Sequence, residues 1–247
     1  MYNFFITNQN LNGEMIKIDG ADFNHIKNVL RMKVGDNFLV SLDGKSSFCE
    51  LASFENDFLL AKIIEKDCYD KALPIEIYLF QGLPKSDKLE LIIQKAVELG
   101  AKEIIPVQME RSIAKIESSK VKSKTERFRA IAESAAKQSK MPFIPTVKEP
   151  MSFNGAIDFA KTLNILLIPY ENKDGIESTI SALQKIQKGA KVGIFIGPEG
   201  GFSQKEIELA EKNGYLISLG KRILRTETAS ITAMSMLMLY AEMKLDK

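Results

Sequence analysis

The chain has 247 residues, of which 45% are apolar and 27% are charged, and its formal net charge is +2 at pH 7. This composition is ordinary for a soluble globular protein with one large domain or two smaller ones, and it excludes a disordered or strongly basic chain. No apolar run approaches the roughly 18 residues that a membrane span needs, and the N-terminus lacks the pattern of a signal peptide.

Cysteine and histidine are scarce. Cys49 and Cys68 are the only cysteines, and His25 is the only histidine. These numbers argue against a disulfide framework and against a zinc site of the Cys/His type. Catalysis by a Ser-His-Asp or Cys-His arrangement would have to use His25. We therefore expect a cytoplasmic protein without a metal site and without a membrane partner.

Charge is distributed unevenly along the chain. Residues 1–72 contain 8 Lys and Arg against 11 Asp and Glu, whereas residues 110–148 contain 10 Lys and Arg against 4 Glu. The basic excess in the second range suits contact with phosphates. A solvated helix face beside a lysine-rich loop explains the same pattern equally well from charge alone.

The first part of the chain has the pattern of a small β-barrel. Short apolar runs alternate with turn signals such as Asn12-Gly13 and Asp43-Gly44. Strands are predicted at residues 3–6, 14–18, 37–42, 46–54 and 58–66. A helix is predicted at residues 22–31, where apolar side chains recur at helical spacing. The spacing of the strands favours a barrel.

After residue 72 the pattern changes to alternating strands and helices. Strands are predicted at residues 75–83, 102–108, 163–171, 191–197 and 215–220, and helices at residues 86–100, 124–139, 175–186, 203–214 and 227–245. The strands are almost entirely apolar. Alternation with apolar strands predicts an α/β fold whose parallel sheet is covered on both faces.

A glycine-rich loop, "GPEGG", follows the strand predicted at residues 191–197. Glycines let a ligand approach the main chain at the carboxyl end of a parallel strand, where ligands of such sheets bind. Ser203 and Glu206 have the spacing of a capping box that starts the next helix. The alternative is a tight turn without a ligand. The loop is neither a P-loop nor a dinucleotide fingerprint, and Glu199 would repel a pyrophosphate.

A second loop, at residues 218–229, exposes backbone at Gly220 and places apolar Ile223 and Leu224 among charged residues. We expect the two loops to face each other from adjacent strand ends and to form a slot with apolar walls and a main-chain rim, which suits an adenine ring. The strand end at residues 168–171 would complete this slot.

Two motifs carry a family resemblance. "GPEGGF" and "LGKRILRTETA", followed by a helical C-terminus, resemble the RsmE family of 16S ribosomal RNA uridine-N3 methyltransferases of the SPOUT class. "HIKNVLRMKVGD" and "GLPKSDKLELIIQKAVELGAKEIIPV" resemble further motifs of this family, in the same order along the chain. The resemblance implies a PUA-like RNA-binding β-barrel at residues 1–72 and a SPOUT methyltransferase domain with a C-terminal trefoil knot at residues 73–247.

The resemblance also implies S-adenosylmethionine as the cofactor and 16S ribosomal RNA, or the assembled small ribosomal subunit, as the partner. The implied cofactor-binding residues are Leu167, Pro169, Tyr170, Ile196, Gly197, Pro198, Glu199, Gly200, Gly201, Leu219, Gly220, Ile223 and Leu224. The implied RNA-binding residues are His25, Lys27, Arg31, Lys33, Lys85, Arg111 and Gln138. For Arg31, capping of its own helix is an alternative of equal weight.

Methylation at N3 requires an unpaired or flipped uridine, because base pairing hides this atom. Arg225 is the candidate catalytic residue, since its charge would stabilise the uridine carbonyls as the N3 proton is lost. The alternative for Arg225 is an ion pair with Glu227 or Glu199. Two other functions stay open: a SPOUT ribose 2′-O-methyltransferase and a non-catalytic RNA-binding ribosome-assembly factor.

The helix predicted at residues 227–245 is apolar nearly all round and therefore needs burial on more than one side. The resemblance implies a homodimer formed through this region. Burial within one subunit is the alternative.

Overall fold

The computed structural model describes residues 1–69, 71–171 and 175–246. These residues form two compact units. The first comprises residues 1–72 together with residues 136–144, and the second comprises residues 73–135 and 145–247. The assignment of RNA binding to residues 1–72 and of methyl transfer to residues 73–247 stays a prediction.

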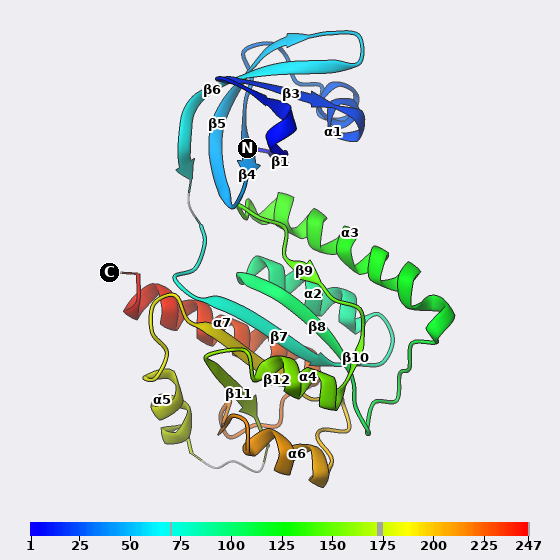
Figure 1. Cartoon of the computed structure of the whole chain (residues 1–247), viewed down its shortest axis with the longest axis vertical. Helices are drawn as coiled ribbons and strands as arrows, with labels where there is room; N and C mark the ends of the chain where they lie inside the picture. Colours follow the sequence, from blue (N-terminus) through cyan, green and yellow to red (C-terminus); the bar gives the residue numbers. More distant parts are fainter. Residues whose placement is uncertain (70, 172–174, 247) are drawn as a thin grey trace. The chain divides into compact units, whose positions relative to one another are not determined.

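The first unit is built on a barrel-like sheet with the strand order β1-β4-β5-β6-β3-β2 (Figure 1). The strands are β1 (Asn3–Phe5), β2 (Leu11–Asn12), β3 (Met15–Asp19), β4 (Asn37–Leu42), β5 (Lys45–Phe54) and β6 (Phe58–Tyr69). All pairs are antiparallel except β1 with β4. The curled sheet encloses an apolar core in which Ile26, Phe38 and Leu51 are fully buried.

A short 3₁₀ turn at Asn8–Asn10 follows β1. The longer helix of the first unit begins as α1 (Gly20–Asn24) and continues as a π-helical turn over His25–Val29. Arg31, which follows the turn, has a positive φ of 53°. The predicted helix at residues 22–31 therefore exists, with a wider turn in its second half. A left-handed residue at a helix C-terminus ends the helix in the usual way.

The sheet of the second unit is parallel throughout the described pairs, in the order β10-β8-β7-β12-β11-β13, with β9 beside β8. The strands are β7 (Glu76–Gly82), β8 (Ala101–Gln108), β9 (Thr146–Val147), β10 (Met151–Ser152), β11 (Ile165–Pro169), β12 (Lys191–Ile196) and β13 (Tyr215–Ile217). This arrangement confirms the predicted α/β fold.

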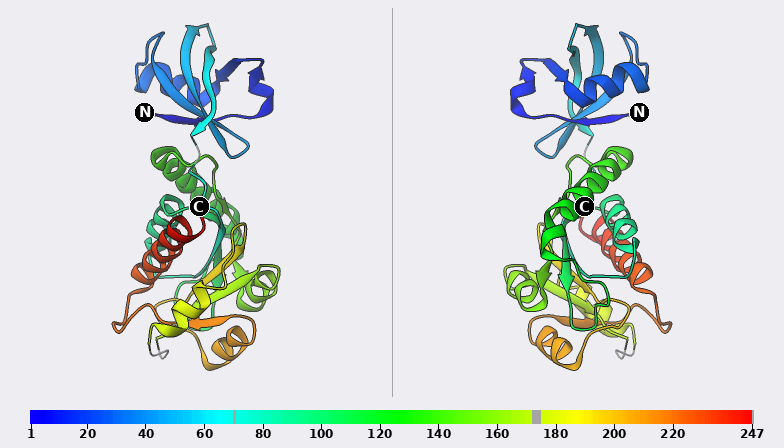
Figure 2. Two further views of the ribbon diagram at one scale, coloured as in Figure 1. Left: turned by 90° about the vertical axis from the view of Figure 1, so that its left-hand side faces the viewer. Right: turned by 90° about the vertical axis from the view of Figure 1, so that its right-hand side faces the viewer.

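Helices cover both faces of this sheet. They are α2 (Lys88–Glu98), α3 (Val121–Ser139, after a 3₁₀ turn at Ser118–Lys120), α4 (Phe153–Ala160), α5 (Glu177–Leu183), α6 (Gln204–Glu211) and α7 (Thr226–Lys244). Helices α2 and α7 lie side by side on one face, and α4 and α6 lie on the other (Figure 2). Side chains of successive strand residues therefore enter two different apolar layers.

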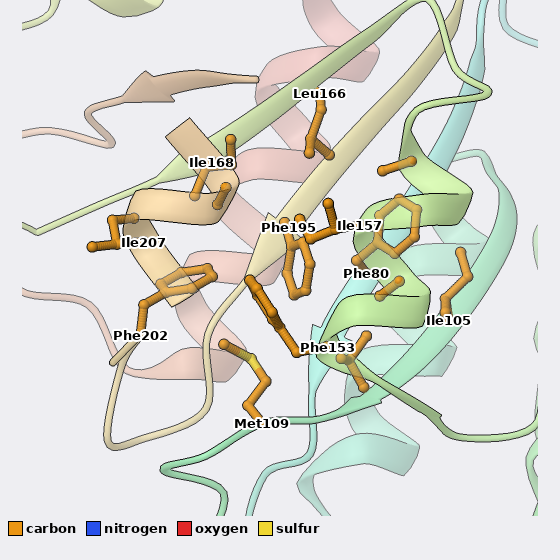
Figure 3. Packing of buried hydrophobic residues seen from close by; sticks show 14 of the residues in the cluster. Phe80, Ile105, Met109, Phe153, Ile157, Leu166, Ile168, Phe195, Phe202 and Ile207 are labelled. Carbon is orange, nitrogen blue, oxygen red and sulfur yellow. The ribbon is translucent and has the colours of Figure 1, made fainter. Parts of the chain in front are cut away.

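Aromatic rings fill the layer beneath α4 and α6. Phe195 of β12 stacks on Phe80 of β7 with ring centroids 5.4 Å apart, and it contacts Phe153 of α4 at 5.2 Å and Phe202 at 5.6 Å (Figure 3). Phe202 directly follows the glycine-rich loop. Burial of its ring therefore anchors that loop in the core.

One expectation about the sheet is wrong. The strands before the two loops are not neighbours, because β11 lies between β12 and β13. Spatial order in a parallel sheet is set by how the helical crossovers pack, which chain order does not reveal. Helix α4 was also not predicted, since its eight residues give too short a pattern. The trefoil knot stays a prediction, because it concerns the threading of α7 and not the pairing of strands.

Candidate cofactor and RNA site

A cavity of about 420 Å³ lies in the second unit at the carboxyl ends of β11, β12 and β13. It is lined by Lys88, Pro169, Tyr170, Glu171, Ile196, Gly197, Pro198, Glu199, Gly201, Phe202, Ser218, Leu219, Gly220, Lys221, Arg222, Ile223, Leu224, Arg225, Thr226 and Ala229. The structure therefore brings together nearly all of the predicted cofactor-binding residues. Leu167 and Gly200 do not line the cavity.

The glycine-rich loop after β12 forms the first wall. A turn closes between Pro198 and Gly201, with the Gly201 N–H donating to the Pro198 carbonyl at 2.9 Å. Gly201 has a φ of +66°, which favours glycine. The loop packs tightly on the end of β7, because a Cβ atom on Gly82 would lie 2.6 Å from the Pro198 nitrogen. The loop is therefore held by direct backbone packing.

The loop after β13 forms the second wall. Thr179 of α5 fixes its start, because its hydroxyl donates to the Ser218 carbonyl at 2.7 Å and accepts from the Ser218 N–H at 3.0 Å. Ile223, on this wall, is 86% exposed, which is unusual for a large aliphatic residue. An apolar ligand face or a second protein surface would cover it.

Residues after β11 form the third wall. Tyr170 donates its backbone N–H to the Ile217 carbonyl at 3.0 Å, which joins the ends of β11 and β13. Leu167 lies deeper in β11 and is completely buried in the sheet. Gly200 faces the other way, since a Cβ atom there would lie 2.9 Å from the Cβ of Arg111. Gly200 therefore serves packing between loops.

An ion cluster borders the cavity, because two of its three members, Lys88 and Glu199, line it. The Lys88 Nζ lies 3.1 Å from the Glu199 Oε1 and 3.1 Å from the Glu227 Oε2. The backbone N–H of Lys85 also donates to Glu199, at 3.1 Å. These contacts connect the loop after β7, the glycine-rich loop and the first turn of α7.

The cluster shifts the pKa of each member toward its charged form. Burial acts to raise the pKa of the Glu199 carboxyl, but hydrogen bonds from the backbone amides of Glu199 and Lys85 and from Lys88 outweigh it and lower the pKa. Glu227 behaves in the same way, through its own amide, Lys88 and the charge of Arg225. Contacts with both carboxylates raise the pKa of Lys88.

Arg225 lies on the second wall and is exposed, and its side chain forms no salt bridge or hydrogen bond with the described residues, although its carbonyl accepts from the Ala229 N–H at 2.8 Å. Among the described residues Arg225 forms no direct ion pair with Glu199 or Glu227, but its charge acts on Glu227 and lowers the pKa of that carboxyl. Its exposed guanidinium also borders the cavity, where a ligand can reach it.

Several cavity residues were missed by sequence reasoning: Lys88, Glu171, Phe202, Ser218, Lys221, Arg222, Thr226 and Ala229. Lys88 stands within the motif "GLPKSDK", and Thr226 within "RTETA", so the motifs did contain a signal. Which of their members reach the cavity depends on contacts between segments more than 100 residues apart, such as Lys88 with Glu199.

Two predicted RNA-binding residues, Lys85 and Arg111, contact the glycine-rich loop from outside the cavity. The Arg111 Nη1 donates to the Gly200 carbonyl at 3.2 Å, and both side chains are exposed. The neighbouring Glu110 N–H donates to the Glu206 Oε1 at 2.9 Å, which ties the loop after β8 to the start of α6. Positive charge thus borders the glycine-rich loop.

The other predicted RNA-binding residues belong to the first unit. His25, Lys27, Arg31 and Lys33 are exposed along the π-helical turn and the loop that follows it. Lys27 Nζ lies 5.1 Å from the centre of the Phe23 ring. Gln138 is exposed on the last turn of α3, within the segment that packs with the first unit.

The cavity suits a flat ligand that has apolar faces and hydrogen-bonding edges, because aliphatic residues and open backbone surround it. Among the described residues, no group of three His, Cys, Asp or Glu side chains is arranged to hold a metal ion. Within the same residues, no helix is long and apolar enough to cross a bilayer.

Comparison with known families places the chain. A model of the RNA methyltransferase domain matches residues 71–238, and a model of the RNA methyltransferase PUA domain matches residues 18–64. The chain is 41% identical over 231 residues to ribosomal RNA small subunit methyltransferase E of Bacillus subtilis (strain 168), covering 92% of this chain and 90% of the relative. The chain belongs to the ribosomal RNA small subunit methyltransferase E family.

Solved structures agree with this family and confirm the predicted resemblance. A ribosomal RNA small subunit methyltransferase E from Neisseria gonorrhoeae, bound to S-adenosylmethionine, is 30% identical with a TM-score of 0.82 and 97% coverage of each chain. A putative methyltransferase from Legionella pneumophila, also in complex with S-adenosylmethionine, is 29% identical with a TM-score of 0.81 and 96% coverage of each chain.

Proposed function

We propose that this protein methylates N3 of a uridine in 16S ribosomal RNA, with S-adenosylmethionine as the methyl donor. The observation that carries this proposal is the cavity at the ends of β11, β12 and β13 in a chain of the ribosomal RNA small subunit methyltransferase E family. Its relative from Neisseria gonorrhoeae was crystallised with the same donor.

The residues of the cavity fit the donor. Ile223, Leu224 and Pro169 offer apolar surface to the faces of an adenine ring, and open backbone at Gly220 can pair with its edges. The carboxylate of Glu199 is paired with Lys88, so it contributes to the shape of the glycine-rich loop more than to the charge of the cavity. The cavity volume of about 420 Å³ is in the range of sites for ligands of this size.

The bound donor supplies a methyl group that is activated by its attachment to a sulfonium. The protein's main task is to align the uridine N3 with this group, because displacement at carbon depends on orientation. Arg225, which lies exposed on the cavity wall, stabilises negative charge on the uridine carbonyls as the N3 proton passes to solvent. This role keeps Arg225 in contact with the reacting base.

The RNA reaches the site as an unpaired or flipped nucleotide, since N3 lies on the Watson–Crick edge. Lys85 and Arg111 border the glycine-rich loop and contact phosphates near the target uridine. The exposed polar residues of the first unit, His25, Lys27, Arg31 and Lys33, together with Gln138, bind RNA as well. Such contacts position the RNA without reading its sequence.

Mass spectrometry of nucleosides from small-subunit RNA tests the substrate. Cells that lack this protein should lose 3-methyluridine, and expression of the intact gene should restore it. An unchanged level of 3-methyluridine would refute the substrate. Loss of a ribose-methylated nucleoside instead would identify a ribose 2′-O-methyltransferase, and calorimetry without any binding of S-adenosylmethionine would favour an RNA-binding assembly factor.

We also propose that the protein acts in the cytoplasm as a homodimer that docks on ribosomal RNA or on the assembled small ribosomal subunit. The support for a dimer is the apolar surface of α7, where Leu239 is 50% exposed and Met243 is 65% exposed. Exposed apolar stripes of this kind are typical of subunit interfaces.

A further inference from the structure

Gln81 is a polar residue inside a strand that is otherwise apolar. It stands near the end of β7, between Phe80 and Gly82, and its side chain is completely buried. A buried amide without partners destabilises a fold strongly, so its hydrogen bonds show what it is used for. Gln81 does not line the cavity. Its side chain lies on the face of the sheet that α7 covers, where it contacts Thr226.

The orientation of the Gln81 amide is fixed by its neighbours. Its Nε2 lies 3.0 Å from the Gly82 carbonyl oxygen, which can only accept, so the nitrogen must face that side. The second hydrogen of the same nitrogen points to the Thr226 Oγ1, at 3.0 Å. Both donors of the amide are thereby used.

This donation determines what Thr226 does. Its hydroxyl oxygen accepts from Gln81, so its single hydrogen is directed elsewhere, to the Gly197 carbonyl at 2.7 Å. Gly197 begins the glycine-rich loop, and the next residue, Pro198, has no N–H. The hydrogen bond therefore sets the plane of the Gly197–Pro198 peptide, from which the wall of the cavity continues.

Ser230 completes the network on α7. Its hydroxyl lies 2.5 Å from the Gln81 Oε1 and 2.8 Å from the Thr226 carbonyl, one helical turn earlier, and these two acceptors share its single hydrogen. Ser230 is 1% exposed and Gln81 is fully buried, so the network lies beneath the solvent-accessible surface. The amide of Gln81 is thus held from both ends, and its direction cannot easily reverse.

We propose that Gln81 is a positioning residue for methyl transfer, which directs the hydroxyl of Thr226 and thereby holds the glycine-rich loop in the shape that the cofactor requires. The inference rests on the proposed binding of S-adenosylmethionine. It extends the site to a residue on β7 that does not line the cavity. Hydrogen bonds from Gln81 to Thr226 and from Thr226 to Gly197 connect β7, α7 and the glycine-rich loop in one chain.

The test compares the wild type with Gln81→Met, which keeps the volume and removes both donors and the acceptor. Calorimetry should show S-adenosylmethionine binding at least tenfold weaker in the variant, with the Michaelis constant for the donor raised by a similar factor and kcat reduced less. A variant that melts at a lower temperature but binds the donor as tightly as the wild type would reduce Gln81 to a structural role and overturn the proposal.

A matched pair at Thr226 tests the same chain should Gln81→Met fail to fold. Thr226→Ser keeps the hydroxyl and should bind S-adenosylmethionine nearly as tightly as the wild type does. Thr226→Val keeps the side-chain shape but removes the hydroxyl, so its affinity for S-adenosylmethionine should fall about tenfold. Equal binding by the two would contradict the proposal. The double variant Gln81→Met with Thr226→Val should be no weaker than either single variant, because both break one chain.

Gln108 provides the control. It stands at the end of the neighbouring strand β8, is half-buried, and donates to the Met109 and Ala114 carbonyls. Gln108→Met should lower the melting temperature without weakening the binding of S-adenosylmethionine. Failure of the wild type itself to bind would refute the proposed function, and this result is distinct from an unchanged affinity in the Gln81 variant.

Discussion

Gly82 shows how a single missing Cβ atom shapes the site. A Cβ there would lie 2.6 Å from the nitrogen and the Cδ of Pro198, and 2.8 Å from the Sδ of Met109. Backbone atoms of a packed loop cannot move aside as a flexible side chain can. The close contact between β7 and the glycine-rich loop therefore requires a glycine at this position.

Gly82→Ala should push the glycine-rich loop away from β7. We expect the free energy of unfolding to fall by about 1–3 kcal/mol, as in other overpacked cores. The affinity for S-adenosylmethionine should fall at least tenfold. Calorimetry and thermal melts measure the two effects. Gly189→Ala is the control: its Cβ would meet no atom within 4 Å, but its φ is +80°, so stability should fall while cofactor affinity remains.

Arg225 and Arg222 are exposed arginines on the same wall, and only Arg225 is assigned to the reaction. Arg225→Ala should lower kcat about 10²–10³-fold, as removal of one electrostatic stabiliser does elsewhere, and leave the affinity for S-adenosylmethionine largely intact. Single-turnover methylation and calorimetry check this. Arg222→Ala should change kcat much less. Loss of cofactor binding in Arg225→Ala would show that Arg225 holds the donor instead.

Residues differ in how far the sequence reveals their roles. The glycines and Pro198 of "GPEGGF" are predicted as cofactor residues by the family resemblance, because the loop taken alone is explained at least as well by a tight strand-to-helix turn without a ligand. Gln81 is not predicted, since an isolated glutamine in an apolar strand has no pattern. Its importance comes from Thr226, 145 positions later in the chain. Contacts of this range exist only once the sheet has formed.

At the scale of elements, the ion cluster joins two helix N-termini and one loop around one ammonium group. Lys88 belongs to the start of α2, Glu199 to the loop after β12 and Glu227 to the first turn of α7. A carboxylate at a helix N-terminus is itself favourable. Removal of Lys88 leaves two carboxylates close together without a counter-charge, which is costly in a partly buried site.

The pKa shifts give the cluster a defined pH window. The pKa of Glu199 and of Glu227 is lowered from 4.5, so their stabilisation is complete above this value and disappears as the pH falls through the lowered pKa. The pKa of Lys88 is raised from 10.5, so its contribution is complete below 10.5 and disappears as the pH rises through the raised pKa.

Lys88→Met should therefore lower the melting temperature most between about pH 5 and pH 10, by roughly 2–4 °C, and the difference from the wild type should shrink in acid. Scanning calorimetry over this range measures it. Lys95→Met is the control, because among the described residues Lys95 pairs only with Glu98 of its own helix, and such a surface pair contributes little to stability. A pH-independent effect of Lys88→Met would contradict the cluster's role.

Elements were easier to predict than their order. Strands β7, β8 and β12 match the predicted ranges within two residues, because apolar runs bounded by polar turns define them. The place of β11 between β12 and β13 was not predicted, and short α4 was missed. Both depend on how helices pack over the sheet, and local periodicity does not record that.

At the scale of the whole molecule, α7 carries two apolar surfaces. Its buried stripe, which includes Ala233, Met234 and Leu237, packs on α2 and β12. Met236, Leu239 and Met243 follow at helical spacing on another side, where Leu239 is 50% and Met243 is 65% exposed. Burial within one subunit therefore accounts for only part of this helix.

A second copy of the chain is the partner that we propose for the exposed stripe, and the oligomeric state tests it. Light scattering of the wild type should give twice the mass of the chain. Leu239→Asp combined with Met243→Asp should give the single mass, because two carboxylates would be buried without partners in the interface.

The control is Ile64→Asp, which changes an exposed apolar residue of β6 in the first unit and should leave the dimer intact. A monomeric wild type, or a double variant that stays dimeric, would refute the interface. Normal methylation by a monomeric double variant would show that one subunit holds a complete site. Lost methylation would show that the site needs the second copy, and the exposed Ile223 on the cavity wall is where that copy would reach it.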